Sequence, residues 1–187
     1  TQTLEPKIFY VYIPTREQNQ IPNFDSAVKD INFATLYSEN QFSGSDRIND
    51  ANQITLGVAS RFLHRESGIE RLRIGAGQRF YFKSQEVTLP GVAPRNSSSS
   101  DLIAALSGLV APNWTIDAGW QYTTDLSQTQ RFNAGVRYQP GPGKVINASY
   151  RYTNGEVLTP NQQTTASASP NNTLRQIDLS SQWPLSR

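Results

Sequence analysis

The stretch ERLRIGAGQRFYFK, residues 70–83, alternates side chains of two kinds. One parity is mostly apolar, from Leu72 to Phe82, and is interrupted only by Gln78. The other parity carries mainly arginine, lysine and glycine. Because successive residues of a strand point to opposite faces of a sheet, this period of two predicts a β-strand with one apolar face and one cationic face.

The same alternation recurs along the chain, whereas helical periodicity is nearly absent. Residues 52–63 are joined to the first stretch by the short segment 64–69, and the two together predict a hairpin. Further strands are expected near residues 4–13, 102–110, 114–123, 131–139, 146–153 and 176–183. The sequence therefore predicts an all-β fold of about eight strands.

The connections alternate between long or medium and short. In chain order they are 14–51, 64–69, 84–100, 111–113, 125–130, 140–143 and 154–173. Alternate connections of an up-and-down antiparallel sheet lie at opposite ends, so every long loop is expected at one end. That asymmetry, with strands long enough to cross an apolar band of roughly 25 Å, is typical of a transmembrane β-barrel.

The polar parity of these strands carries eight basic residues. An arginine or lysine facing lipid near the midplane costs about 2–4 kcal/mol, so this parity is expected to face a wet lumen. The expected cationic wall comprises Arg61, Arg71, Arg73, Arg79, Lys83, Arg131, Arg137 and Arg151, against the acids Asp117 and Asp178. Such a wall could attract phosphate-bearing cargo, or it could pair with acidic residues of loop 14–51 or of a plug. Glycines on the same face (57, 75, 77, 119 and 135) would let such a segment approach closely.

Aromatic residues fall near the expected strand ends, as in the interfacial girdles of membrane barrels. Aromatic residues are also common in strands of any sheet, which is the alternative explanation. The expected girdle comprises Phe80, Phe82, Trp114, Trp120, Tyr122, Tyr150 and Tyr152.

The residues offer little support for an enzyme or a metalloprotein. There is no cysteine, and the one histidine, His64, lies in a short turn with only Ser67 as a nearby nucleophile. Residues 46–52 contain Asp and Asn but lack the glycine and closing glutamate of a calcium loop. A net charge of only +2 argues against a nucleic-acid partner. We expect no catalytic residue, no cofactor and no bound metal.

Several stretches resemble a known family. They are residues 4–14 (LEPKIFYVYIP), 21–25 (IPNFD), 42–53 (FSGSDRINDANQ), 70–73 (ERLR) with 77–78 and 81–82, 147–152 (NASYRY) and 183–184. Together they resemble LptD, the lipopolysaccharide-assembly outer-membrane proteins, also called organic solvent tolerance proteins. The resemblance implies that residues 1–187 are one partial domain, an internal fragment of a larger C-terminal barrel, with an extracellular or lumenal loop at 14–51.

The resemblance also implies a function and partners. A wall of this kind would help insert lipopolysaccharide into the outer leaflet of the bacterial outer membrane, in contact with outer-membrane lipid and with the plug lipoprotein LptE. Within loop 14–51, the expected plug-contact residues are Phe42, Gly44, Asp46, Arg47, Asp50 and Asn52. A general porin or solute channel is one alternative, and a soluble β-rich binding module is another.

Overall fold

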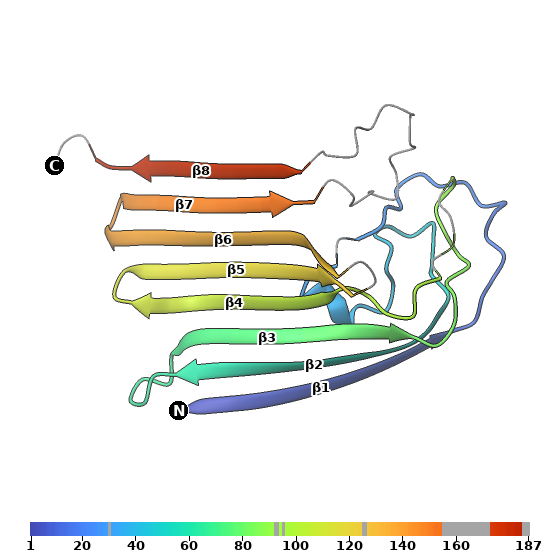
Figure 1. Cartoon of the computed structure of the whole chain (residues 1–187), viewed down its shortest axis with the longest axis horizontal. Helices are drawn as coiled ribbons and strands as arrows, with labels where there is room; N and C mark the ends of the chain where they lie inside the picture. Colours follow the sequence, from blue (N-terminus) through green and yellow to red (C-terminus); the bar gives the residue numbers. More distant parts are fainter. Residues whose placement is uncertain (30, 92–93, 95, 125–126, 155–172, 185–187) are drawn as a thin grey trace.

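The computed structural model describes residues 1–184 except 30, 92–93, 95, 125–126 and 155–172. Eight antiparallel strands form one sheet in the order of the chain (Figure 1). The strands are β1 Gln2–Ile13, β2 Ala51–Leu63, β3 Glu70–Tyr81, β4 Leu102–Ala111, β5 Trp114–Thr123, β6 Gln128–Gly141, β7 Lys144–Thr153 and β8 Leu174–Gln182. The predicted all-β, up-and-down fold is confirmed. The sheet is open, with β1 and β8 at its two edges, as a part of a larger barrel requires.

The longest connection, 14–50, and the shortest turns lie at opposite ends of the sheet (Figure 1). The predicted alternation of connection length fails at one place, because the β5–β6 connection spans only residues 124–127 and is shorter than the turn 64–69. The C-terminal ends of β1, β3, β5 and β7 lie at one end of the sheet, here called the loop end. The connections that follow β2, β4 and β6 are short and lie at the opposite, turn end. Several strand boundaries differ from the prediction by one to three residues; for example, β3 already ends at Tyr81 and β6 already begins at Gln128. Most of the predicted connection 154–173 lies outside the described residues.

Apart from local register shifts, residues of like parity lie side by side from β1 to β7, and β8 joins with the opposite parity, so that Ile177 lies beside Tyr150. On one face, Gly57 lies opposite Gly77 and Thr55 lies opposite Arg79. We call this the cationic face, and its opposite the apolar face. Large apolar side chains of the apolar face are exposed, from 38% for Trp120 to 78% for Leu179. A sheet that presents so much apolar surface on one side is suited to a hydrocarbon environment there.

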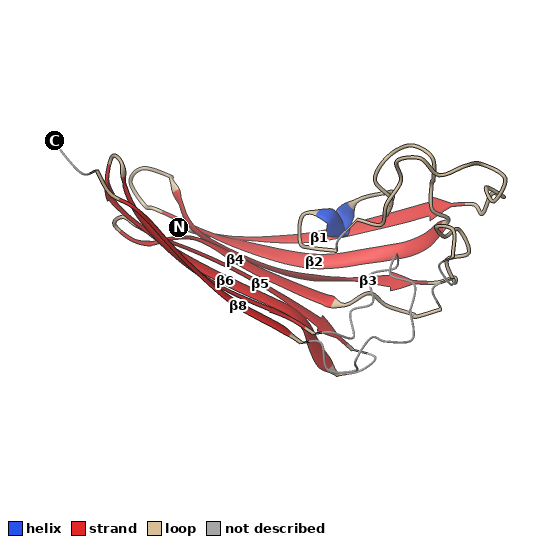
Figure 2. Cartoon of the chain, turned by 90° about the horizontal axis from the view of Figure 1, so that it is seen from above, coloured by secondary structure: helices blue, strands red, loops and turns tan. Residues whose placement is uncertain are grey.

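Loop 14–50 folds back over the cationic face instead of extending away from the sheet. Its short 3-10 turn, η1 (Thr35–Tyr37), lies to one side of the curved sheet near β1–β3 (Figure 2). At the loop end, Phe42 of this loop is buried with Val87 and Leu89 of the next long loop, and Val28 packs against them. Within the described part of the chain, no helix has the length and apolar character needed to cross a membrane.

Candidate functional site

Loop 14–50 sits in a cradle of glycines on the cationic face. The side chain of Tyr37 lies against Gly57, that of Phe33 against Gly75 and that of Leu36 against Gly77. A Cβ atom on Gly75 would lie 2.5 Å from Phe33 Cζ, and one on Gly77 would lie 2.8 Å from Leu36 Cδ2, which are distances that real side chains do not tolerate. The expectation that wall glycines admit a close approach is confirmed at these three positions.

Arg79 is buried beneath this loop, with only 4% of the residue exposed. Its Nη2 donates to the carbonyl oxygen of Leu36 at 2.5 Å and to that of Ser38 at 3.2 Å, and its Nε donates to Thr55 Oγ1 at 3.4 Å. Both carbonyls belong to η1 and the residue that follows it. Arg79 therefore holds the loop against the wall through backbone carbonyl groups, whereas the alternative considered above was pairing with acidic residues of the loop.

Two further wall cations pair with acids of the same face. Arg61 Nη2 lies 2.7 Å from Glu5 Oε2, and Arg61 Nε lies 3.8 Å from Glu70 Oε2. Arg73 donates from Nε and Nη2 to the two carboxylate oxygens of Glu70, at 2.9 and 3.0 Å. Arg71 is half-buried beside the register shift between β2 and β3. Neither Glu5 nor Glu70 was expected on this face, so the charge of the wall is less positive than predicted.

A cation of β1 outside the predicted cationic wall also contacts the loop. Lys7 of β1 extends its ammonium over the ring of Tyr37, with Nζ 4.1 Å from the ring centroid. Partial burial against the wall raises the pKa of the Tyr37 hydroxyl. The contact joins the first strand to η1.

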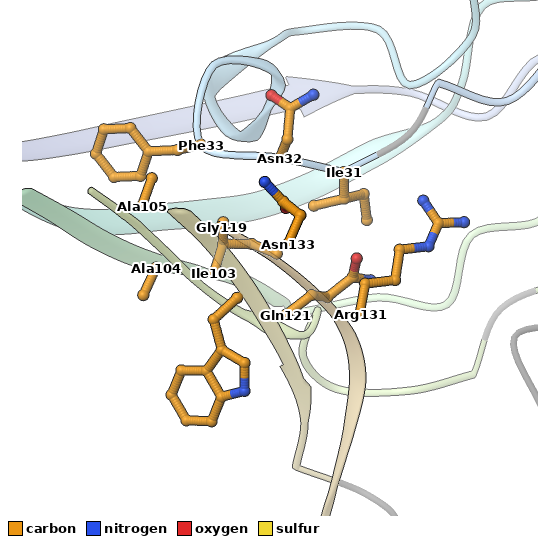
Figure 3. A pocket seen from close by; sticks show the side chains of 11 residues that line it. Ile31, Asn32, Phe33, Ile103, Ala104, Ala105, Gly119, Gln121, Arg131 and Asn133 are labelled. Carbon is orange, nitrogen blue, oxygen red and sulfur yellow. The ribbon is translucent and has the colours of Figure 1, made fainter. Parts of the chain in front are cut away.

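The cations of β6 and β7 lie farther along the sheet. Arg137 and Arg151 are exposed, and Arg137 Nε donates to Asn147 Oδ1 at 3.1 Å. Arg131 lines a small cavity of about 220 Å³ between the loop and the wall, with Phe33 on its other side (Figure 3). A second cleft of about 640 Å³, also lined by Phe33, has Lys7 and Arg73 in its walls. These open spaces are where a ligand or another protein segment could reach the cationic face.

Asp50 fastens the two long loops to each other. Its carboxylate accepts hydrogen bonds from the backbone N–H of Glu86 at 3.1 Å and of Val87 at 3.0 Å, and from the Thr15 hydroxyl at 3.0 Å. Lys83 lies in the same cluster, donating to Thr15 Oγ1 at 3.1 Å and lying 3.6 Å from Glu86 Oε1. Lys83 is thus placed among the loops and not on the sheet itself.

The six expected plug-contact residues have different surroundings. Phe42, Arg47 and Asp50 are buried within the chain, Gly44 is exposed and Asp46 is half-buried. Asn52 lies on the apolar face, where its Oδ1 accepts a hydrogen bond from the Tyr10 hydroxyl at 3.0 Å. The exposed apolar side chains of this loop are three that the sequence did not single out, namely Ile21, Phe24 and Ile48.

Polar groups beneath those three side chains bind one another. Asp46 Oδ2 accepts the backbone N–H groups of Asp25 at 2.8 Å and Phe24 at 2.6 Å, and these bonds lower the pKa of Asp46. Arg47 Nη2 donates to the Ile21 carbonyl at 2.7 Å, and Gln18 Nε2 donates to the Ile48 carbonyl at 2.8 Å. The loop is therefore a folded unit with an apolar tip, formed by Ile21, Phe24 and Ile48.

Aromatic residues of the apolar face gather in two bands. The expected girdle residues Phe80, Trp120, Tyr122, Tyr150 and Tyr152 lie toward the loop end, and Phe82 follows β3 there. Trp114 lies at the turn end, stacked on Tyr138 with ring centroids 4.6 Å apart. Tyr138 and Trp183 were not predicted, although their parity is that of their neighbours on the apolar face.

His64 and Ser67 do come together in the β2–β3 turn. Ser67 Oγ lies 3.1 Å from His64 Nδ1, and the Ser67 backbone N–H also donates to this nitrogen at 3.4 Å. Both residues are exposed at the turn end. This pair stabilises a tight turn and is remote from the clefts on the cationic face.

An open antiparallel sheet with one exposed apolar face and one loop-covered cationic face is part of the wall of a transmembrane β-barrel. The model of the family described as LptD, LPS transport system D, matches residues 1–187. The chain belongs to the LptD family. It is 48% identical over 186 residues to the LPS-assembly protein LptD of Thiobacillus denitrificans, covering 100% of this chain and 23% of that protein.

Two further relatives carry the same name. The LPS-assembly protein LptD of Chromobacterium violaceum is 44% identical, over 99% of this chain and 22% of its own length. That of Aromatoleum aromaticum is 46% identical, over 98% of this chain and 21% of its own length. The chain thus spans about a fifth of the length of these curated relatives.

Proposed function

We propose that this chain is part of an outer-membrane translocon that inserts lipopolysaccharide into the outer leaflet. In this proposal it supplies a portion of the barrel wall, and its cationic face lines the lumen. The observation that carries the proposal is the contrast between the two faces of one sheet, since the apolar face suits lipid and the other carries charge and a folded loop. We infer that the transported molecule is lipopolysaccharide from the family of the chain and from the names of its relatives.

The cations of β6 and β7 are the ones best suited to meet that cargo. Arg61, Arg73 and Arg79 are engaged by acids or carbonyls of the chain itself. Arg137 and Arg151 are exposed on the part of the wall that lies farther from η1. Guanidinium groups in a lumen bind phosphate through charge-assisted hydrogen bonds and raise its local concentration.

Charge reversal tests this role. In the full-length protein, Arg137→Glu combined with Arg151→Glu should slow the appearance of lipopolysaccharide at the cell surface several-fold, because anionic cargo is then repelled. Arg65→Glu, in the turn 64–69, reverses one charge and is the matched control for Arg137→Glu and Arg151→Glu made singly. Barrel assembly is followed by heat-modifiable migration on gels. Normal surface lipopolysaccharide in the double variant, with the barrel assembled, would assign these arginines a structural role only.

We extend the proposal to the plug lipoprotein LptE, with the apolar tip of loop 14–50 as its contact. The tip residues Ile21, Phe24 and Ile48 are 48%, 85% and 55% exposed. The buried residues Phe42, Arg47 and Asp50 would act by keeping the tip folded. Exposed apolar groups on a scaffold whose polar groups are already bonded are the kind of anchor that protein interfaces use.

Co-purification distinguishes the contact from its scaffold. Phe24→Ser should reduce the LptE recovered with the full-length protein while the loop keeps its protection from proteases. Phe42→Ala and deletion of residues 42–52 should reduce both, because they remove the packing under the tip. Unchanged LptE recovery with Phe24→Ser and with the deletion would exclude this loop as a plug contact.

A further inference from the structure

Charge is almost absent from the apolar face. Of the strand residues that the regular register assigns to this face, only Lys144 and Arg175 are charged. Lys144 begins β7 at the turn end, and Arg175 lies near the start of β8 at the loop end. The two cations therefore stand at opposite rims of the same pair of strands (Figure 1).

The spacing between the rims corresponds to the apolar thickness of a membrane. Arg175 pairs with Tyr152, and Tyr152 is eight residues after Lys144 on β7. Eight residues of extended strand span about 26 Å. A tilt of roughly 40° reduces this to a height of about 20 Å, and the long side chains extend it at both ends toward the roughly 25 Å of an outer-membrane barrel.

Each cation lies over an aromatic ring of the same face. Lys144 Nζ is 5.1 Å from the ring centroid of Trp183, and Arg175 Cζ is 5.9 Å from that of Tyr152. Aromatic rings of this kind settle at the level of lipid headgroups. Within the described residues, the guanidinium of Arg175 has this ring contact and makes no ion pair or hydrogen bond.

We propose that Arg175 and Tyr152 form a binding site for the phosphate monoester of a lipid headgroup in the leaflet at the loop end. The guanidinium presents parallel N–H donors that match two oxygens of one phosphate, whereas the Lys144 ammonium is a point charge without that geometry. The site lies on the outside of the barrel wall. It depends on the apolar face meeting lipid and is independent of how cargo crosses the lumen.

Native mass spectrometry of the full-length protein tests the site with two probes, bisphosphorylated lipid A and the same lipid after removal of both phosphates. The unaltered protein should retain the phosphorylated form several-fold better. Arg175→Gln should reduce that preference several-fold, whereas the matched control Lys144→Gln should keep it. Arg175→Lys should keep part of it, because the charge remains while the paired donors are lost.

Three outcomes would overturn the proposal. These are an undiminished preference in Arg175→Gln, an equal loss in Arg175→Gln and Lys144→Gln, and a complete loss in Arg175→Lys. Arg175→Gln should leave lipopolysaccharide export normal. Because the lumenal arginines could also bind phosphate, the preference is measured again with Arg137→Glu and Arg151→Glu present, where adding Arg175→Gln should still reduce it. The export proposal and the lipid-site proposal therefore fail separately.

Discussion

Removing the Asp50 carboxylate should release the two long loops from each other. In Asp50→Ala, the backbone N–H groups of Glu86 and Val87 and the Thr15 hydroxyl lose their acceptor. Hydrogen bonds to a charged group contribute about 1.5–3 kcal/mol each, although water replaces part of this once the loops separate. Taking about 1 kcal/mol net for each of the three bonds gives a loss of about 3 kcal/mol in loop docking.

A loss of that size corresponds to an opening constant about 10²-fold larger. Hydrogen–deuterium exchange on the full-length protein measures it directly, since the Glu86 and Val87 amides themselves donate to Asp50. Their exchange should accelerate by about that factor, while amides in the middle of β6 should exchange as before. Asp50→Asn keeps one carbonyl acceptor, so its exchange rates at these two amides should lie between those of the unaltered protein and those of Asp50→Ala. Unchanged exchange at Glu86 and Val87 in Asp50→Ala would refute the conclusion that Asp50 holds the two long loops together.

Three further results are expected. Gly75→Val should displace Phe33 from the wall, so that proteases cleave loop 14–50 faster although the strands still pair. An unchanged cleavage rate would contradict the conclusion that the wall glycines hold this loop. The pKa of Asp46 is below its ordinary value of 3.8 because the Asp25 and Phe24 N–H groups favour the carboxylate. Its contribution to the folded tip is therefore complete above pH 4 and lost as pH falls through the lowered pKa, a loss that tip-amide exchange should show and Asp46→Asn should lack. Ala118→Arg places a charge in the middle of the apolar face and should destabilise the full-length barrel by about 2–4 kcal/mol in denaturant titration, whereas Thr115→Arg on the cationic face should cost much less.

The strands and the ends at which the loops lie were predictable because both depend on local pattern. Alternation along residues 70–83 fixes which side chains share a face, and connection lengths reveal the up-and-down order. The glycine cradle was also foreseeable in outline. A run of small residues on one face of a wall indicates that something approaches it, although it does not say which segment does so.

The roles of the individual cations were not predictable from one sequence. Arg61, Arg79 and Arg137 have the same parity, yet one pairs with acids, one is buried under η1 and one is exposed. Their surroundings depend on the cross-strand register and on the path of loop 14–50, and both arise from long-range packing. Register also shifts at four places, which a single strand does not reveal.

The loop core was missed for a similar reason. Phe42, Val87 and Leu89 lie in segments without periodicity, so no alternation marks them as buried. Residues 42–52 were interpreted as a contact surface from their resemblance and from the length and acid excess of loop 14–51. In the structure, the Asp46 and Asp50 carboxylates instead accept backbone N–H groups of the loops.

Because each strand pairs only with its neighbours along the chain, the wall can be assembled one hairpin at a time. The entropy cost of closing the connection differs between these steps. The β4–β5 connection has only residues 112–113, whereas pairing β1 with β2 requires closure of loop 14–50. Each doubling of a closed loop costs about 0.6 kcal/mol, and roughly four doublings separate these two cases. The strands β4 to β7, whose connections 112–113, 124–127 and 142–143 are all short, should therefore pair first. The docking of Phe33 and Leu36 against the glycines would offset the late penalty at the β1 side.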